Sequence, residues 1–398
     1  SVGRPAEAYK MELKEHFPDN TSEIDAYFEA LLSAEEAGHM IGAHRAMPEP
    51  FRSAHQWWNK RKIQRWCGRT TGEVIEELIS DPKLADVLSA QWGTYGGNPK
   101  EASFAFHGII MGHYLEGAAY PVGGAGAIAK GLVPVIEAAG GSAQAGTPVS
   151  EILLEEGKAV GVRTKSGEEF HAPTIVSAIG AGETVKRLLP EEVSQQDWAR
   201  EITTFKPSIC HYDLFLGFEG DISQHGASRS NHWFYQSWDT SDAIWTGAGE
   251  DPIQMMFVSF GSLKNPAHDP GSKDRHTGDI LVWADWSSVA EFANGGADDR
   301  PEEWKAFKQA IESRMMDLFK EKFPGLAPLI TYHELGTPLA TAEFTRHEKG
   351  GFYGVETSPR RMLSEALNAR TPVPGLFLSG QDVMSPGIAG ALAGGMLG

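Results

Sequence analysis

The stretch Leu376-Phe377-Leu378-Ser379-Gly380-Gln381-Asp382, followed by Gly387-Ile388-Ala389-Gly390-Ala391-Leu392-Ala393-Gly394-Gly395, decides the fold. Its apolar beginning predicts a short buried strand, and its glycine- and alanine-rich second half predicts the start of a helix. Small residues at such a turn let a ligand approach the backbone closely. The same pattern also occurs in ordinary strand-to-helix turns that pack tightly, so the motif alone leaves both interpretations open.

The predicted helix start has a definite electrostatic character. Free N–H groups and the partial positive charge of a helix N-terminus attract an anionic group. A reduced flavin carries negative charge on its N1–C2=O edge, so this turn suits a flavin. We expect Asp382 to accept hydrogen bonds from ribityl or ribose hydroxyls.

Two earlier segments are compatible with a dinucleotide site. In Tyr120-Pro121-Val122-Gly123-Gly124 two glycines follow a proline, which lets the backbone lie flat against a ring system. From residue 147 the apolar period changes to two, which predicts a hairpin and then a fully buried strand over 174–180. Val149 would face an adenine with its backbone, and Ala178 would leave room for the ADP half. A bare turn and an unrelated α/β domain remain the alternatives.

The remaining chain predicts a mixture of helices and strands. Residues up to about 98 have helical periodicity, beginning with Ile24, Tyr27, Phe28, Leu31 and Leu32 on one face. Later, 209–218, 254–260 and 280–286 predict strands of a separate sheet, and 304–323 predicts an amphipathic helix.

Composition excludes several classes of function. The 398 residues are 41% hydrophobic and 22% charged, as in ordinary globular proteins. The 35 basic and 53 acidic residues give a net charge of −18, which argues against nucleic acid as a partner. Cys67 and Cys210 stand far apart, which is typical of buried thiols in a reducing, cytoplasmic compartment. The histidines have no metal-ligand spacing, so we expect no metal site. No apolar run is long enough to predict a spanning helix.

One basic segment stands out in this acidic chain. Three tryptophans alternate with four cations within a single predicted helix: Trp57, Trp58, Lys60, Arg61, Lys62, Arg65 and Trp66. This mixture suits a helix that lies at a bilayer interface and makes the protein a peripheral membrane protein. A surface helix whose cations extend over partly buried tryptophans is the alternative.

Taken in order, the segments resemble a known family. The matching pieces run from His113-Tyr114 and Tyr120-Pro121-x-Gly123-Gly124 through Val176-Ser177-Ala178, Gly336-Thr337-Pro338-Leu339 and Phe352-Tyr353-Gly354 to Leu378-Ser379-Gly380-Gln381-Asp382. This collinear set, from about residue 9 to the end, resembles the phytoene desaturase and retinol saturase branch of the FAD-dependent amine oxidase-like superfamily.

The resemblance implies an α/β fold with two parts. A Rossmann-type FAD domain would be assembled from discontinuous segments, and a substrate domain would consist of an antiparallel sheet and a helical cap. On this basis 1–115 form the mainly helical cap, 116–190 a segment of the FAD domain, 191–340 the substrate domain and 341–398 the return to the FAD domain. Relatives carry a G-x-G-x-x-G turn that is not found in these residues, so we expect it upstream of Ser1.

The resemblance also implies a cofactor and its contacts. FAD would contact residues of the C-terminal motif and the helix start: Gly380, Gln381, Asp382, Ile388, Ala389, Gly390 and Ala391. Gly123, Gly124, Val149 and Ala178 complete the expected cofactor-binding set.

The implied reaction is saturation or desaturation of a carbon–carbon bond in a hydrophobic polyene or isoprenoid, by hydride transfer at flavin N5. Saturation also needs a proton, for which His107, His113, Tyr114 and Tyr353 are candidates by residue type. Each of them is also compatible with a purely structural role. Three other functions stay open: a redox-neutral isomerase, a lipid-binding protein that kept the fold without the cofactor, and an amine oxidase.

Overall fold

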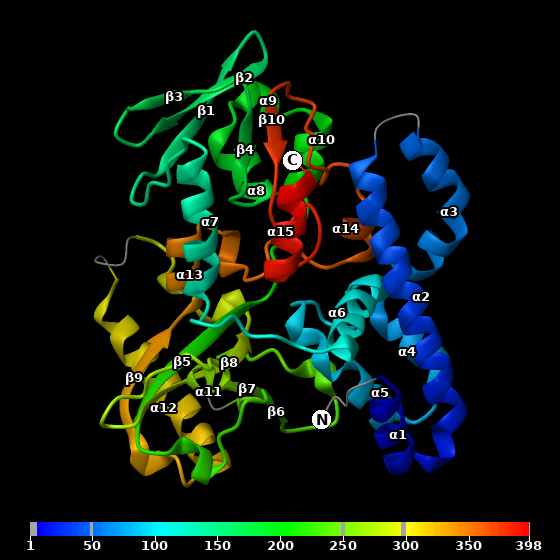
Figure 1. Ribbon diagram of the computed structural model, residues 1–398, viewed down its shortest axis with the longest axis vertical. Coiled ribbons are helices and arrows are strands. Elements are labelled where there is room, and N and C mark those ends of the chain that lie inside the picture. The colour runs from blue at the N-terminus through cyan, green and yellow to red at the C-terminus, as the bar shows by residue number, and fades with distance from the viewer. Residues whose placement is uncertain (1–5, 48–50, 248–250, 296–299, 398) are drawn as a thin grey trace. The chain divides into compact units, whose positions relative to one another are not determined.

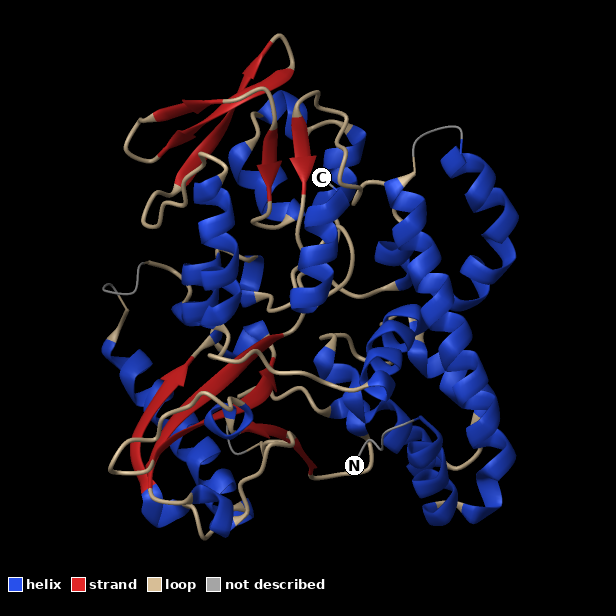
Figure 2. Ribbon diagram, in the orientation of Figure 1, coloured by secondary structure: helices blue, strands red, loops and turns tan. Residues whose placement is uncertain are grey.

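The computed structural model describes residues 6–47, 51–247, 251–295 and 300–397, which form two compact units (Figure 1). Unit 1 contains Ser1–Ala118, Thr147–Ile209 and Thr345–Gly398, and unit 2 contains Ala119–Gly146 and Cys210–Phe344. Each unit is assembled from segments that are distant in sequence. The fold is the mixed α/β architecture that the sequence predicts (Figure 2).

The first part of unit 1 is helical, as its periodicity predicts. Its helices are α1 (Ala6–His16), α2 (Thr21–Ala46), α3 (Phe51–Cys67), α4 (Thr71–Leu78), α5 (Pro82–Ser89) and α6 (Phe104–Glu116). Thr70 caps α4, because its hydroxyl accepts from the Glu73 N–H while the Glu73 carboxylate accepts from the Thr70 N–H. α2 and α6 pack closely: a Cβ on Gly108 would lie 2.7 Å from the Glu35 nitrogen. Small residues therefore set the distance between these two helices.

His107 lies in the core of this helical part and is fully buried. Its Nε2 is 2.7 Å from the Tyr27 hydroxyl, and its Nδ1 is 3.2 Å from the Tyr95 hydroxyl. Burial lowers the pKa of the imidazole from 6.5 to about 3, because the charged form would lose its hydration. Both ring nitrogens form hydrogen bonds with tyrosine hydroxyls, so neither nitrogen can bind a substrate.

The buried histidine predicts an acid-sensitive fold. Because the folded-state pKa is lowered, the unfolded chain binds the extra proton, and stability falls as pH drops from about 6.5 toward about 3. In His107→Gln the free energy of unfolding should fall less steeply as pH decreases. The slope should be smaller than in the wild type by up to ~1.4 kcal/mol per pH unit. Urea unfolding between pH 7 and pH 5 measures this slope. The exposed His16→Gln is the control, and equal slopes in the two variants would contradict the assignment.

The second part of unit 1 contains two small sheets and short helices. β1 (Val149–Glu155), β2 (Lys158–Thr164) and β3 (Glu169–His171) form an antiparallel meander, and β4 (Ile175–Ser177) pairs in parallel with β10 (Leu376–Leu378). The helical elements are α8 (Ala181–Glu183), the π-helical turn η3 (Thr184–Leu188), α9 (Glu191–Ser194), α10 (Asp197–Thr203), α14 (Pro359–Leu363) and α15 (Gly387–Leu397). The short β10 and the helix after it confirm the strand and helix predicted from the C-terminal motif.

The prediction of a fully buried strand over 174–180 is wrong. β4 has only three residues, and Val176 is 53% exposed. Ser177, its neighbour, is buried, so only one face of this strand is covered. A continuous apolar run predicts burial on both faces, whereas among the described strands β4 pairs with β10 alone.

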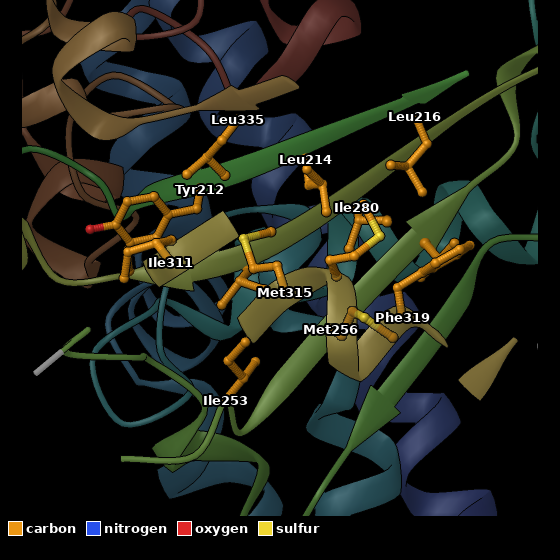
Figure 3. Close-up of a cluster of buried hydrophobic side chains, with 14 of the residues drawn as sticks. Tyr212, Leu214, Leu216, Ile253, Met256, Ile280, Ile311, Met315, Phe319 and Leu335 are labelled. Carbon is orange, nitrogen blue, oxygen red and sulfur yellow. The ribbon is translucent and has the colours of Figure 1, made fainter. Parts of the chain in front are cut away.

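Unit 2 is built on a five-stranded antiparallel sheet in the order β6-β7-β8-β5-β9. The strands are β5 (Cys210–Glu219), β6 (His232–Tyr235), β7 (Met255–Ser259), β8 (Arg275–Ala284) and β9 (Ile330–Gly336). Alternate side chains of β5 and β8 face the long helix α12 (Glu302–Lys322), and together they form the core shown in Figure 3. The other helices are α7 (Gly126–Ala138), α11 (Gly261–Lys264) and α13 (Pro338–Thr345). The three predicted strands and the amphipathic helix are confirmed with shifts of a few residues.

Candidate functional site

The parallel pair β4–β10 creates the edge on which the candidate site stands. Ile175 pairs with Leu376 and Ser177 with Leu378, so the carboxyl ends of both strands meet at the same edge. Ligands of open α/β folds bind at such edges. Each strand leaves it through a glycine with positive φ, Gly180 at 111° and Gly380 at 92°. These dihedrals are readily available only to glycine, which explains the small residues at both turns.

Asp382 lies immediately beyond the β10 turn and is 2% exposed. Its Oδ2 accepts a hydrogen bond from the Ala181 N–H at 2.8 Å, and its Oδ1 accepts one from the Val355 N–H at 3.0 Å. A buried carboxylate requires such donors, since desolvation would otherwise be costly. One side chain thereby joins the turn after β4, the turn after β10 and the segment around Val355.

Glycines allow the backbone to come close to this carboxylate and to the β10 turn. A Cβ on Gly354, whose φ is 71°, would lie 2.0 Å from Asp382 Oδ1. A Cβ on Gly394 would lie 2.4 Å from the carbonyl oxygen of Gly380, so α15 packs directly on the turn. The glycine pattern of the C-terminal motif therefore serves close packing of the helix as well as the turn.

The start of α15 has the properties that a flavin requires. The Gln381 side-chain oxygen accepts from the Gly387 N–H at 3.3 Å, and the next N–H groups have no acceptor within the helix. Ile388 is 61% exposed and Leu392, one turn later, is 50% exposed. A helix N-terminus that attracts negative charge thus lies beside an exposed apolar surface on which a ring system can pack. These residues fit FAD.

A small cavity lies behind the two turns. Its volume is about 30 Å³, room for a water-sized group, and its lining consists of Gly180, Gly182, Glu183, Lys186, Ile202, Phe205, Pro207, His347, Glu348, Gly354, Val355 and Asp382. His347 donates from Nδ1 to the Gly351 carbonyl at 2.9 Å, which holds its ring at this cavity. The sequence carries no motif around His347, and the residue was not among the predicted site residues.

The structure brings together most of the predicted cofactor residues. Ala178, Gly380, Gln381 and Asp382 surround the β4–β10 edge, and α15 carries Ile388, Ala389, Gly390 and Ala391 in its first turn. Val149 opens β1 in the same unit and is half-buried. Gly123 and Gly124 belong to unit 2, where their φ values of 92° and 78° form the turn before α7. The Gly123 N–H donates to the Asn265 side chain at 2.8 Å.

The other proton-donor candidates belong to unit 1. His113 is exposed near the end of α6, and its ring stacks on Tyr114 with centroids 5.6 Å apart. Burial raises the pKa of the Tyr114 hydroxyl. Burial, followed by the nearby Tyr114, raises the pKa of Tyr353 still further. Both tyrosines therefore keep their protons at neutral pH. Tyr353 packs on Gly96, where a Cβ would lie 2.3 Å from the ring.

α3 divides its tryptophans between surface and core. Trp57 and Trp58 are 75% and 80% exposed, whereas Trp66 is 8% exposed with the Arg65 guanidinium 4.6 Å from its ring centroid. Lys62 pairs with Glu36 of α2. Residues 57–61 of α3 thus form an aromatic and basic surface, and Ile63, Trp66 and Cys67 at its end are packed into unit 1. None of the described helices has the length and apolar character needed to span a bilayer.

The fold and this site define a class of protein, the FAD-dependent oxidoreductases. FAD, when bound, supplies hydride transfer, and the residues at the β4–β10 edge and at the start of α15 fit such a group. The profile of the family described as "Flavin containing amine oxidoreductase" matches residues 3–397, and the chain belongs to this family.

Individual relatives agree with this assignment. All-trans-retinol 13,14-reductase from Danio rerio is 29% identical over 406 residues, covering 98% of this chain and 67% of that protein. Chloroplastic prolycopene isomerase from Arabidopsis thaliana is 26% identical over 367 residues, covering 88% of this chain and 58% of that protein. A solved oxidoreductase from Methanosarcina mazei superposes with a TM-score of 0.56 at 19% identity, covering 88% of this chain and 72% of that one. The resemblance, the fold class and the FAD cofactor predicted from the sequence are confirmed.

The Gly354–Asp382 contact makes a specific prediction. Gly354→Ala places a Cβ against Asp382 Oδ1 at a strained φ, which should cost about 3 kcal/mol or more of stability and weaken FAD binding at least ~10-fold. Gly157→Ala is the control, because its φ is also positive (77°) but its Cβ would meet nothing within 4 Å. Strain alone should cost it about 1 kcal/mol. Thermal unfolding and FAD titration compare the two, and equal effects would contradict the role of this contact.

Proposed function

We propose that this enzyme saturates a carbon–carbon double bond of a hydrophobic polyene or isoprenoid. The observation that carries the proposal is the likeness to all-trans-retinol 13,14-reductase over 98% of the chain. The name of that relative describes the reduction of all-trans-retinol at positions 13 and 14. Prolycopene isomerase, which matches 88% of the chain, favours a redox-neutral isomerisation of a similar substrate as the second candidate.

The chain's own groups have a limited part in this chemistry. Gly380, Asp382 and the start of α15 hold the cofactor at the β4–β10 edge, with Ala178 lining the same edge. Saturation adds a hydride to one carbon and a proton to its neighbour. We assign the proton to Tyr353, because it directly precedes Gly354 and so lies beside the segment that holds Asp382, and its hydroxyl is protonated at neutral pH.

The test uses the full-length protein with bound FAD. Under anaerobic conditions with a chemical reductant, all-trans-retinol or a carotenoid should be converted to a product that has gained a hydride and a proton, measured by mass spectrometry. Tyr353→Phe keeps the ring packed on Gly96, so it should retain FAD and substrate while turnover falls ~100-fold.

Each other outcome selects a different function. A product of unchanged mass but altered double-bond geometry would support the isomerase and overturn saturation. Protein that folds without flavin absorbance and still binds the polyene would be a lipid-binding protein that kept the fold. Unchanged turnover in Tyr353→Phe would exclude this tyrosine as the proton source and leave the reaction itself intact.

We also propose that the enzyme is cytoplasmic and takes its substrate from a membrane surface through residues 57–61 of α3. Trp57 and Trp58 are exposed, and Lys60 and Arg61 lie one turn further along the same helix. Tryptophan suits the boundary of headgroups and acyl chains, and the cations suit anionic lipid, despite the net charge of −18. Cys67 and Cys210 are buried free thiols, in agreement with a reducing compartment.

Sedimentation with vesicles tests this surface. The double variant Trp57→Ala/Trp58→Ala should bind anionic phosphatidylserine vesicles about 10-fold more weakly, because two large apolar side chains no longer enter the interface. Trp238→Ala is the matched control, since Trp238 is 55% exposed but belongs to unit 2. Equal binding by the two variants would show that α3 is an ordinary surface helix.

A further inference from the structure

Arg361 is a buried cation directly beneath the candidate flavin turn. It belongs to α14 and is 0% exposed. Its Nη1 donates to the Val355 carbonyl at 2.6 Å, and its Nη2 donates to the Gln381 carbonyl at 2.5 Å. The guanidinium also lies 5.1 Å from the Phe106 ring centroid. Backbone carbonyls and an aromatic face surround this charge. Burial lowers the pKa of the guanidinium, and the nearby Asp382 carboxylate acts in the opposite direction by favouring the charged form.

A second arginine holds the other side of the same turn. Arg45, near the end of α2, donates from Nη1 to the Val383 carbonyl at 2.6 Å. Its Nη2 lies 3.2 Å from the Arg361 carbonyl, so the two cations share a backbone segment. Burial lowers the pKa of each guanidinium to about 10, which still leaves both charged at neutral pH.

Together these contacts fix three consecutive residues of the turn. The carbonyl of Gln381 accepts from Arg361, the carboxylate of Asp382 accepts from two backbone N–H groups, and the carbonyl of Val383 accepts from Arg45. Each of these carbonyls is held by a charged guanidinium donor, so the direction of the turn is set before any ligand arrives.

Burying a guanidinium costs free energy of hydration, and an apolar side chain would suffice if the residue only stabilised the fold. Apolar packing often stabilises a fold as well as a buried charge does. The charge of Arg361 offsets that of the neighbouring Asp382 carboxylate, so that carboxylate does not cancel the partial positive charge of the α15 N-terminus, which favours negative charge on a bound group. A reduced flavin carries such a charge.

We propose that Arg361, supported by Arg45, is a positioning residue for the flavin: it fixes the 381–383 turn and favours the anionic reduced cofactor. This inference rests on the flavin site assigned above to the β4–β10 edge. It goes beyond that site, because Arg361 contacts only the backbone of the residues that would touch the cofactor.

The test compares three variants of the FAD-loaded, full-length protein. Arg361→Met removes the charge and the hydrogen bonds to the Val355, Glu356 and Gln381 carbonyls, so FAD affinity should fall ~10- to 100-fold and the midpoint potential of the remaining bound flavin should become more negative. Arg361→Lys keeps a charge but not the fork, so the potential should stay near the wild-type value while affinity is only partly restored. Arg360→Met is the matched control, because Arg360 is exposed in the same helix and contacts the Phe205 ring.

The outcomes distinguish an error in the flavin site from an error in the role of Arg361. Wild-type protein that folds but does not bind FAD would overturn the flavin site itself. Arg361→Met with lowered thermal stability but wild-type affinity and potential would show a purely structural arginine and overturn this inference alone. If Arg361→Met fails to fold, Arg361→Lys decides: wild-type affinity in that variant would contradict the need for the fork.

Discussion

The buried carboxylate of Asp382 is the constraint on which the site depends. Two backbone N–H groups, from Ala181 and Val355, converge on it from segments distant in sequence. A carboxylate is the side chain that can accept both bonds with a full charge, which makes each bond stronger than a neutral one. Gly354 is then forced by proximity, since any side chain there would enter the carboxylate. The hydrogen bonds of this one buried carboxylate thus determine the path of three chain segments.

The local part of this arrangement could be predicted from sequence, and the non-local part could not. The strand at 376–378 and the helix after Gly387 follow from apolar periodicity and small residues, and 304–323 from helical spacing. Arg361 lies in a Pro-Arg-Arg-Met-Leu run that reads like a surface helix. Its burial and its contacts with the Val355 and Gln381 carbonyls distinguish it from its neighbour Arg360, and these contacts depend on tertiary packing. His347 and Gly354 escaped prediction for the same reason.

The chemistry of the class explains why few conventional catalytic groups are found among the described residues. In flavin enzymes the cofactor carries the reactive atoms, and the protein contributes orientation, exclusion of water and a field. The polar candidates divide accordingly. His107 is occupied by Tyr27 and Tyr95, whereas Tyr353 lies next to Gly354 and thus beside the segment that holds Asp382. In the proposed site this chain contributes mainly glycines, backbone groups and buried charges.

The discontinuity of the β4–β10 edge has a consequence for biosynthesis. Residues 178–181 leave the ribosome long before 380–391, yet they share one edge through parallel pairing. Until the later segment has emerged from the exit tunnel, β4 cannot pair with β10 and the Ala181 N–H lacks the Asp382 carboxylate. The β4–β10 edge is therefore completed late, after translation of the C-terminal motif. During that interval the backbone groups of β4 that later pair with β10 are open to chaperones.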